Sequence, residues 1–403
     1  MIPIYNPDPR GARKALLIER LLANRITMVE LSELSLVVDA GDLAHIIRKI
    51  YDLNEKTILG LAALSAAMRL FDNRKNDRRN RRFIRKIRHG FRDGSNKERK
   101  VVLAEGDSWF NYPVILTDVV DALGMDSNIA VYSIAKGGDW LLNMLTGRQY
   151  VEELSVLVPD IFLISGGGND IVGSSRLGAI VQKAAADPNP EYEASEFCRF
   201  LMTRARTDLY AFDKAKFERG IRFLAKDFFS LLMFFHLQYF FMMNGILNGG
   251  QTGKTKFPGI RILTQGYDFP IPSLNKGFGP NPFKWYVPFV RLFLGHGSWL
   301  KIPLEKRGIY DPEDQKSILY AMIYLFNEMM INVGGSFNAE TRRVFHIDSR
   351  NSVGDDGWTD ELHALPKHFL DTGKVFAFCI HDEGGRHATY DHVYMVTQLT
   401  AKP

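Results

Sequence analysis

The sequence is poor in cysteine, since its 403 residues include only Cys198 and Cys379. Two cysteines cannot build the disulfide framework of a small secreted domain, and no cysteine or histidine cluster has the spacing of a structural zinc site. The amino terminus lacks the basic start, apolar stretch and small-residue cleavage site of a secretory signal. Internal repeats and low-complexity tracts are also missing. We therefore expect a globular, cytoplasmic protein in a reducing compartment.

Charge is unevenly distributed along the chain. Residues 74–100 hold 13 Lys and Arg against 3 Asp and Glu, so this basic segment carries +10 while the remaining residues sum to −5. Such a run is usually a solvated, partly helical linker, which is our interpretation. The alternatives are a phosphate-binding patch for nucleic acid and an anchor to anionic lipid, with Phe83, Ile84 and Ile87 entering the interface. Nucleic acid is the weaker alternative because no base-reading motif accompanies the segment.

Hydrophobic periodicity indicates helices first and an α/β pattern afterwards. The pattern in residues 10–73 predicts helices, and Asp42 and Asn54 are the predicted N-caps of two of them. From residue 100 onward strands alternate with helices, which is typical of a parallel sheet covered on both faces. The predicted strands are 100–104, 129–134, 160–165, 260–265 and 343–348, and the predicted helices lie near 113–123, 140–157 and 312–332. Two more strands, 374–380 and 391–398, are expected after this core, around a turn at Gly384 and Gly385.

The chain is thereby divided into five parts, one of which is a long insertion in the α/β pattern. They are an N-terminal helical region (1–73), a basic linker (74–99), a first core part (100–182), a helical insertion (183–257) and a second core part (258–403). The insertion contains an aromatic run, residues 228–244, that is long enough to span a membrane. Because His236, Gln238 and Asn244 interrupt this run, a buried or lid-like helix is favoured over membrane contact, and membrane contact over a true span.

Four short motifs follow predicted strands, where the carboxyl edge of a parallel sheet binds ligands. Ser108 stands in a small-residue turn after the first strand, and a glycine turn at 133–139 follows the second. Asn169 lies on a glycine turn after the third strand, and Asp360 and His363 follow the fifth at a spacing that suits one face of a helical turn. A serine hydroxyl needs an adjacent base to become nucleophilic, and a tetrahedral oxyanion needs fixed donors. The motifs together supply both.

With these four ordered motifs the sequence resembles the SGNH hydrolases, also called GDSL esterases and lipases, over roughly residues 100–182 and 258–370. The resemblance implies a flavodoxin-like, three-layer α/β/α sandwich with a mostly parallel, five-stranded central sheet. It implies Ser108 as nucleophile, His363 as general base and then acid, and Asp360 as the group that orients the imidazole. The implied reaction is ester hydrolysis through an acyl-enzyme, without metal or cofactor.

The same resemblance implies an oxyanion hole. Its donors would be the backbone N–H groups of Ser108 and Gly138 and the side-chain amide of Asn169, with Gly137 as an alternative to Gly138. Trp109 departs from the family pattern, in which a small aliphatic residue is common at that position. This departure leaves the substrate open.

Several alternatives accompany this hypothesis. His346 and Asp348 end a strand and could replace the acid–histidine pair, although Asp360 and His363 match the motif spacing better. A C-terminal group of residues could be imagined as metal ligands: His381, Asp382, His387 and His392. Because their spacing matches no standard metal site, surface or turn roles are the preferred interpretation. For the substrate, a lipid or long-chain acyl ester is slightly favoured over a small acyl group on a carbohydrate. A different class of function is a membrane-surface or nucleic-acid-binding protein that uses the basic segment and carries an idle hydrolase fold.

Overall fold

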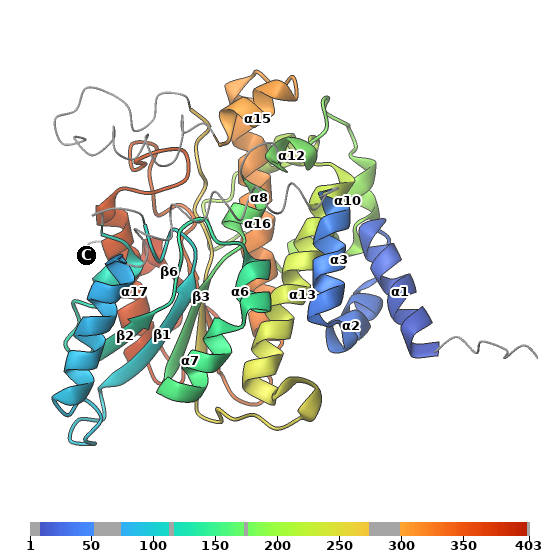
Figure 1. Ribbon diagram of the computed structural model, residues 1–403. Coiled ribbons are helices and arrows are strands. Elements are labelled where there is room, and N and C mark those ends of the chain that lie inside the picture. Colours follow the sequence, from blue (N-terminus) through green and yellow to red (C-terminus); the bar gives the residue numbers. More distant parts are fainter. Residues whose placement is uncertain (1–8, 52–73, 113–116, 173–175, 274–298, 401–403) are drawn as a thin grey trace, which may run out of the picture.

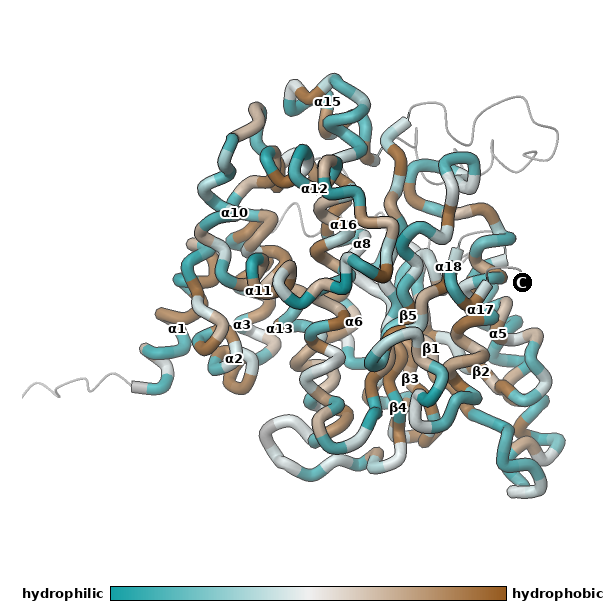
Figure 2. Tube along the Cα trace, turned by 180° about the vertical axis from the view of Figure 1, so that it is seen from behind, coloured by the Kyte–Doolittle hydropathy of each residue, from teal (hydrophilic) through white to brown (hydrophobic). Residues whose placement is uncertain are grey.

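The computed structural model describes residues 9–51, 74–112, 117–172, 176–273 and 299–400 (Figure 1). A six-stranded parallel sheet in the order β2-β1-β3-β4-β5-β6 forms its centre. The strands are β1 (Lys100–Gly106), β2 (Ile129–Ser133), β3 (Ile161–Ser165), β4 (Arg261–Gln265), β5 (Val344–Asp348) and β6 (Val393–Met395). Hydrophobic residues are concentrated in these strands, which are buried almost throughout (Figure 2). The five strands predicted for the central sheet are confirmed, and a sixth joins them.

Helices cover both faces of the sheet (Figure 1). The helices α5 and α17 pack together on one face, whereas α6, α7 and α16 lie on the other. In chain order the helices are α1 (Pro9–Leu22), α2 (Met28–Val37), α3 (Ala40–Ile50), α5 (Val119–Leu123), α6 (Leu141–Gly147), α7 (Gln149–Leu157), α8 (Gly168–Ile171), α9 (Arg176–Ala179), α10 (Pro190–Ala194), α11 (Glu196–Arg204), α12 (Lys214–Ile221), α13 (Lys226–Asn248), the 3₁₀ turn η1 (Gly250–Thr252), α15 (Lys301–Lys306), α16 (Pro312–Gly335), α17 (Pro366–His381) and α18 (Val396–Leu399).

The C-terminal region differs from the prediction of a separate strand pair. Residues 374–380 belong to α17, not to a strand, and the buried residues Phe369, Phe376 and Ile380 recur on this helix at helical spacing. Of the second expected strand, only β6 is extended. It pairs in parallel with β5, with His346 opposite Val393, and so belongs to the central sheet. The central sheet therefore has six strands, and the predicted number of five was wrong.

The N-terminal helices α1, α2 and α3 pack on α13, the helix that carries the aromatic run (Figure 1). The Ser230 hydroxyl of α13 donates a 2.9 Å hydrogen bond to the Leu21 carbonyl of α1. By length and composition α13 and α16 could each cross a membrane, but 78% and 83% of their most apolar stretches are buried inside the protein. Within the described residues, α13 is thus a core helix under a cover of shorter helices.

Two predicted N-caps have different outcomes. Helix α3 begins one turn earlier than predicted, because Asp39 is its N-cap and Asp42 occupies the third helical position of a capping box. The helix expected after Asn54 lies outside the described residues.

The basic segment is partly helical, as expected, but it is not solvated throughout. Residues 74–88 are helical, and Phe83 and Phe91 are buried against Val101 and Ala130 of β1 and β2. Arg79, only 6% exposed, donates hydrogen bonds to Asp118 at 2.6 Å and to Asp121 at 2.9 Å. Burial of a guanidinium is tolerated here because two carboxylates accept its hydrogen bonds. One side of this helix therefore belongs to the core, and the arginines of the other side face solvent.

Candidate active site

Ser108 is presented by a tight turn at the end of β1. The Asp107 carboxylate accepts a 3.0 Å hydrogen bond from the Trp109 backbone N–H, and the Asp107 carbonyl accepts bonds from the Phe110 and Asn111 N–H groups. A Cβ atom on Gly106 would lie 2.9 Å from the Ser165 carbonyl oxygen, so only glycine allows β1 and β3 to approach so closely at this point. The turn leaves Ser108 partly exposed between buried neighbours.

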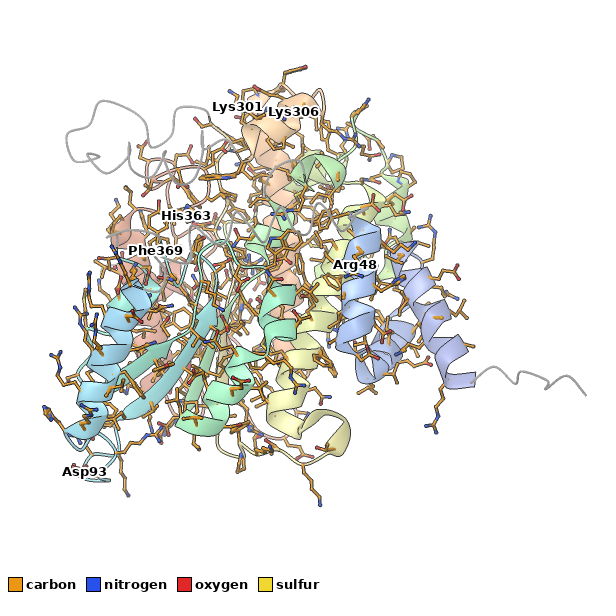
Figure 3. The ribbon with its side chains drawn as sticks, viewed as in Figure 1. Arg48, Asp93, Lys301, Lys306, His363 and Phe369 are labelled. Carbon is orange, nitrogen blue, oxygen red and sulfur yellow. The ribbon has the colours of Figure 1, made fainter. Side chains whose placement is uncertain are left out.

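His363 lies beside Ser108 and is supported by Asp360. Its Nε2 is 2.8 Å from the Ser108 Oγ, and its Nδ1 is 2.9 Å from the nearer Asp360 carboxylate oxygen. The site lies at the carboxyl end of the strands, and Figure 3 shows His363 at the end of the sheet opposite Asp93. The structure thus brings together the three residues predicted for the triad.

The spacing of Asp360 and His363 suggested that they share a helical turn. In the structure they lie in a loop instead. Trp358 and Ala364 form an antiparallel bridge, and within this narrow loop the Thr359 N–H donates a 2.7 Å hydrogen bond to the His363 carbonyl. The loop returns the chain on itself. Consequently, the Asp360 side chain also accepts a 2.8 Å hydrogen bond from the backbone N–H of His363.

Asp360 is buried, 3% exposed, yet it is held ionised. Burial alone would raise the pKa of its carboxyl, but the adjacent His363 and the backbone N–H groups of Leu362 and His363 lower the pKa below its usual range. An ionised carboxylate only accepts hydrogen bonds, so the proton between the two side chains resides on the His363 Nδ1. The Nε2 lone pair then faces the Ser108 hydroxyl.

The candidate oxyanion donors lie on the turns that follow β1, β2 and β3. The backbone N–H groups of Ser108 and Gly138 donate no hydrogen bond to any of the described residues. Gly138, with a φ of 74°, lies in the left-handed region of a turn after β2. The Asn169 amide donates one hydrogen bond, of 3.1 Å, to the Asp139 carbonyl, which orients the amide and leaves its second N–H for a ligand. Ser108 and Asn169 line one pocket.

A buried tyrosine, which was not predicted as part of the site, connects three of its turns. The Tyr267 hydroxyl donates a 2.5 Å hydrogen bond to the Asp107 carboxylate and accepts one of 3.1 Å from the Gly168 N–H. Burial raises the pKa of the Asp107 carboxyl to about 6, although the hydrogen bond from Tyr267 acts to lower it. The signal that could have identified Tyr267 is its place directly after β4, at the edge where the motifs gather.

Aromatic rings enclose His363. The Tyr112 ring centroid is 4.4 Å from that of the imidazole, and the Tyr112 hydroxyl donates a 3.3 Å hydrogen bond to Asp360. Trp109 donates from its indole nitrogen to the Leu362 carbonyl at 3.3 Å. The ring of Trp299 stands edge-on to His363, with 6.3 Å between the centroids. These contacts fix the histidine loop against the serine turn.

The alternative acid–histidine pair lies outside this arrangement. His346 is fully buried, with its Nδ1 2.9 Å from the Thr264 hydroxyl, and Asp348 forms an ion pair with Arg350. Neither side chain bonds Ser108.

The C-terminal histidines are dispersed. His381 pairs with Asp126, His387 pairs with Asp382, and His392 bonds the Ile331 carbonyl. In the described part of the chain, no three side chains of the metal-ligating types form a group that could hold a metal ion.

Comparison with known proteins does not add to this picture, since no protein-family model, no curated protein and no solved structure matches the chain.

Proposed function

We propose that this protein is a serine ester hydrolase that acts through an acyl-enzyme on Ser108. The observation that carries the proposal is the continuous hydrogen-bond series from the Ser108 Oγ to the His363 Nε2 at 2.8 Å and from the His363 Nδ1 to Asp360 at 2.9 Å. A histidine within hydrogen-bond reach of a serine, itself oriented by an acid, is the arrangement that activates a hydroxyl.

In the first half of the reaction the Ser108 Oγ attacks the ester carbonyl carbon while its proton passes to the His363 Nε2. The carbonyl oxygen becomes an oxyanion, for which Ser108 N–H, Gly138 N–H and the free amide N–H of Asn169 are the proposed donors. The bond to the alcohol oxygen then breaks, and His363 returns the proton to that oxygen. The alcohol leaves, and the acyl group stays on Ser108.

In the second half a water molecule takes the place of the alcohol. His363 removes a proton from the water, whose oxygen attacks the acyl carbon. When the tetrahedral intermediate collapses, His363 gives the proton to the Ser108 Oγ and the carboxylic acid is released. The ionised Asp360 stabilises the imidazolium in both halves, and removal of one oxyanion donor in such a site typically slows turnover about 100- to 1,000-fold.

The proposed family is that of the SGNH hydrolases, with their three-layer, flavodoxin-like core. Three features support it: a parallel sheet with helices on both faces, four motifs in family order at the carboxyl edge, and the approach of the first and last motifs within 2.8 Å. The sixth strand, the N-terminal helices and the insertion are additions to that core.

Labelling with a fluorophosphonate probe followed by peptide mass spectrometry tests this function. We expect covalent modification at Ser108, its loss in Ser108→Ala and strong slowing in His363→Ala. The matched control is Ser155→Ala, which removes an exposed serine on α7 and should label normally. A folded wild-type protein that hydrolyses no p-nitrophenyl ester and is not labelled would refute the proposal.

A second candidate function, binding to an anionic membrane surface, is favoured by the exposed side of the 74–88 helix. Arg78, Arg81, Arg85 and Arg88 are all exposed, recur at helical spacing and form no ion pair with any described residue. Ile84, 43% exposed, lies among them. Phe83 and Phe91 are buried, so neither can stack on bases, and Phe83 cannot enter a lipid interface as the sequence suggested; the exposed apolar residue beside the arginines is Ile84.

Sedimentation with vesicles tests this second function. The protein should bind vesicles containing phosphatidylserine but not pure phosphatidylcholine, and binding should weaken steeply with salt. The variant Arg78→Gln/Arg81→Gln/Arg85→Gln should lose binding, whereas Ser108→Ala should retain it. Equal binding of the triple variant would reject the arginine face as the contact surface.

A further inference from the structure

A pocket opens beside Ser108 between the catalytic turns and helix α16. Its empty space, counted out into the open solvent at its mouth, is about 550 Å³. Leu319, Met322 and Ile323 enter it from α16 at the i, i+3, i+4 spacing of one helix face. Ile171 and Val172 line it from the segment after Asn169. Most of its wall is therefore apolar.

Apart from Ser108 and Asn169, the carboxylates among the described residues of this wall are already occupied by other parts of the protein. The Asp107 carboxylate accepts hydrogen bonds from Tyr267 and Trp109. The Asp268 oxygens accept bonds of 2.7, 2.7 and 2.5 Å from the backbone N–H groups at 269, 351 and 353. A sugar or another polyhydroxylated group would leave water without finding replacement partners, which is unfavourable. An aliphatic chain would gain from leaving water.

The position of His363 decides which half of an ester enters the pocket. The alcohol oxygen must lie next to His363, which gives it a proton, and His363 does not line the pocket. Ser108 and Asn169, which would hold the carbonyl carbon and its oxygen, do line it. The group on the other side of the carbonyl carbon, the acyl chain, therefore points toward α16.

On the basis of the proposed hydrolase function, we infer that this pocket binds the acyl chain, and that the substrates are esters of aliphatic acids with several carbons, not acetyl esters. Three buried residues of its lining, Leu319, Met322 and Ile323, belong to α16, and Val172 lines it from the segment after Asn169. Specificity for chain length thus resides largely on α16.

The test compares kcat/KM for p-nitrophenyl esters from acetyl to decanoyl. Full burial of a methylene raises kcat/KM about fourfold, so the four additional methylenes of hexanoyl set a ceiling of about 250-fold over acetyl, and we expect a gain of at least tenfold. Ile323→Trp, which narrows the pocket, should lower the hexanoyl-to-acetyl ratio at least tenfold. Val172→Phe narrows the pocket from the segment after Asn169 and serves as the second variant. Ile331→Trp, placed eight residues further along α16 and outside this pocket, should keep the wild-type ratio.

Two results would overturn the inference, and they differ from each other. If Ser108 is labelled by fluorophosphonate but the ratio is unchanged in both narrowed variants, or rates follow the alcohol chain in a series of alkyl acetates, the acyl assignment is wrong while the hydrolase function stands. If Ser108 is not labelled and no ester is cleaved, the proposed function is wrong and the acyl pocket is rejected with it.

Discussion

Removal of the Tyr267 hydroxyl should destabilise the protein more than removal of a comparable buried hydroxyl nearby. In Tyr267→Phe both the Asp107 carboxylate, bonded at 2.5 Å, and the Gly168 N–H, bonded at 3.1 Å, lose their buried partner. At about 1–3 kcal/mol for each buried polar group left unpaired, we expect a loss of about 2–4 kcal/mol in the free energy of unfolding. Tyr239→Phe is the matched control, since it removes one hydrogen bond, to the Gly166 carbonyl, and should cost about half as much.

The pH dependence of this loss separates the hydrogen bond from simple packing. Burial already raises the pKa of Asp107 to about 6, and the Tyr267 bond acts against that rise, so the pKa should be higher still in the variant. A carboxyl with a raised folded-state pKa binds more protons folded than unfolded, and its contribution to stability is lost as pH rises from about 4 through that pKa. The deficit of Tyr267→Phe, measured by urea denaturation, should thus be larger at pH 8 than at pH 5. Equal deficits at both pH values, or a smaller loss than in Tyr239→Phe, would refute the reasoning.

Three further predictions concern the triad, the basic segment and a buried acid. Asp360→Asn should remain folded but lower kcat for p-nitrophenyl butyrate about 10³- to 10⁴-fold, because it favours the wrong imidazole tautomer; a loss below tenfold would contradict a triad. Arg79→Ala should lower the free energy of unfolding in urea by about 1.5–3 kcal/mol, because the buried Asp118 carboxylate loses its bonds from the guanidinium and keeps Lys75 as its ion-pair partner, whereas the exposed Arg78→Ala should change it by less than about 0.5 kcal/mol. Burial raises the pKa of Asp170 to about 7, so the wild-type protein should lose stability from pH 5 to pH 8 as this carboxyl ionises. In Asp170→Asn that loss, measured by thermal or urea unfolding, should be smaller by about 2–3 kcal/mol. The same pH slope in both proteins would show that Asp170 does not titrate in this range.

Local patterns were sufficient for the elements that carry the site. An apolar run that ends in a small-residue turn marks β1 and the Ser108 turn, and the same pattern marks β3 before Asn169. Once these strands are taken as parallel, their carboxyl ends must meet at one edge. The neighbourhood of Ser108 and His363 could therefore be anticipated across the 255 positions that separate them.

Contacts between distant segments produce no local sequence pattern and could not be predicted. Asp107 and Tyr267 are 160 positions apart, and one hydrogen bond produces no periodicity at either end. Arg79 is one of many arginines in its segment, and nothing in the local sequence distinguishes the one that meets Asp118 from those that face water. The apolar run at 374–380 is compatible with a strand as well as with a helix. It is helical because it continues the helix that already contains Phe369, and because α17 packs on α5.

The packing of α1, α2 and α3 on α13 affects how the chain is made. The ribosome completes the three helices first, but α13 follows only after about 180 further residues, between Ile50 and Lys226. At synthesis rates of about 5–20 residues per second, the apolar side of α3, with Leu43 and Ile47, stays without its final partner for roughly 10–35 s. During that interval the nascent chain exposes apolar surface, which is prone to aggregation. A shortened chain from which residues 1–51 are deleted would have the complementary problem, an uncovered α13, and we expect it to aggregate on expression.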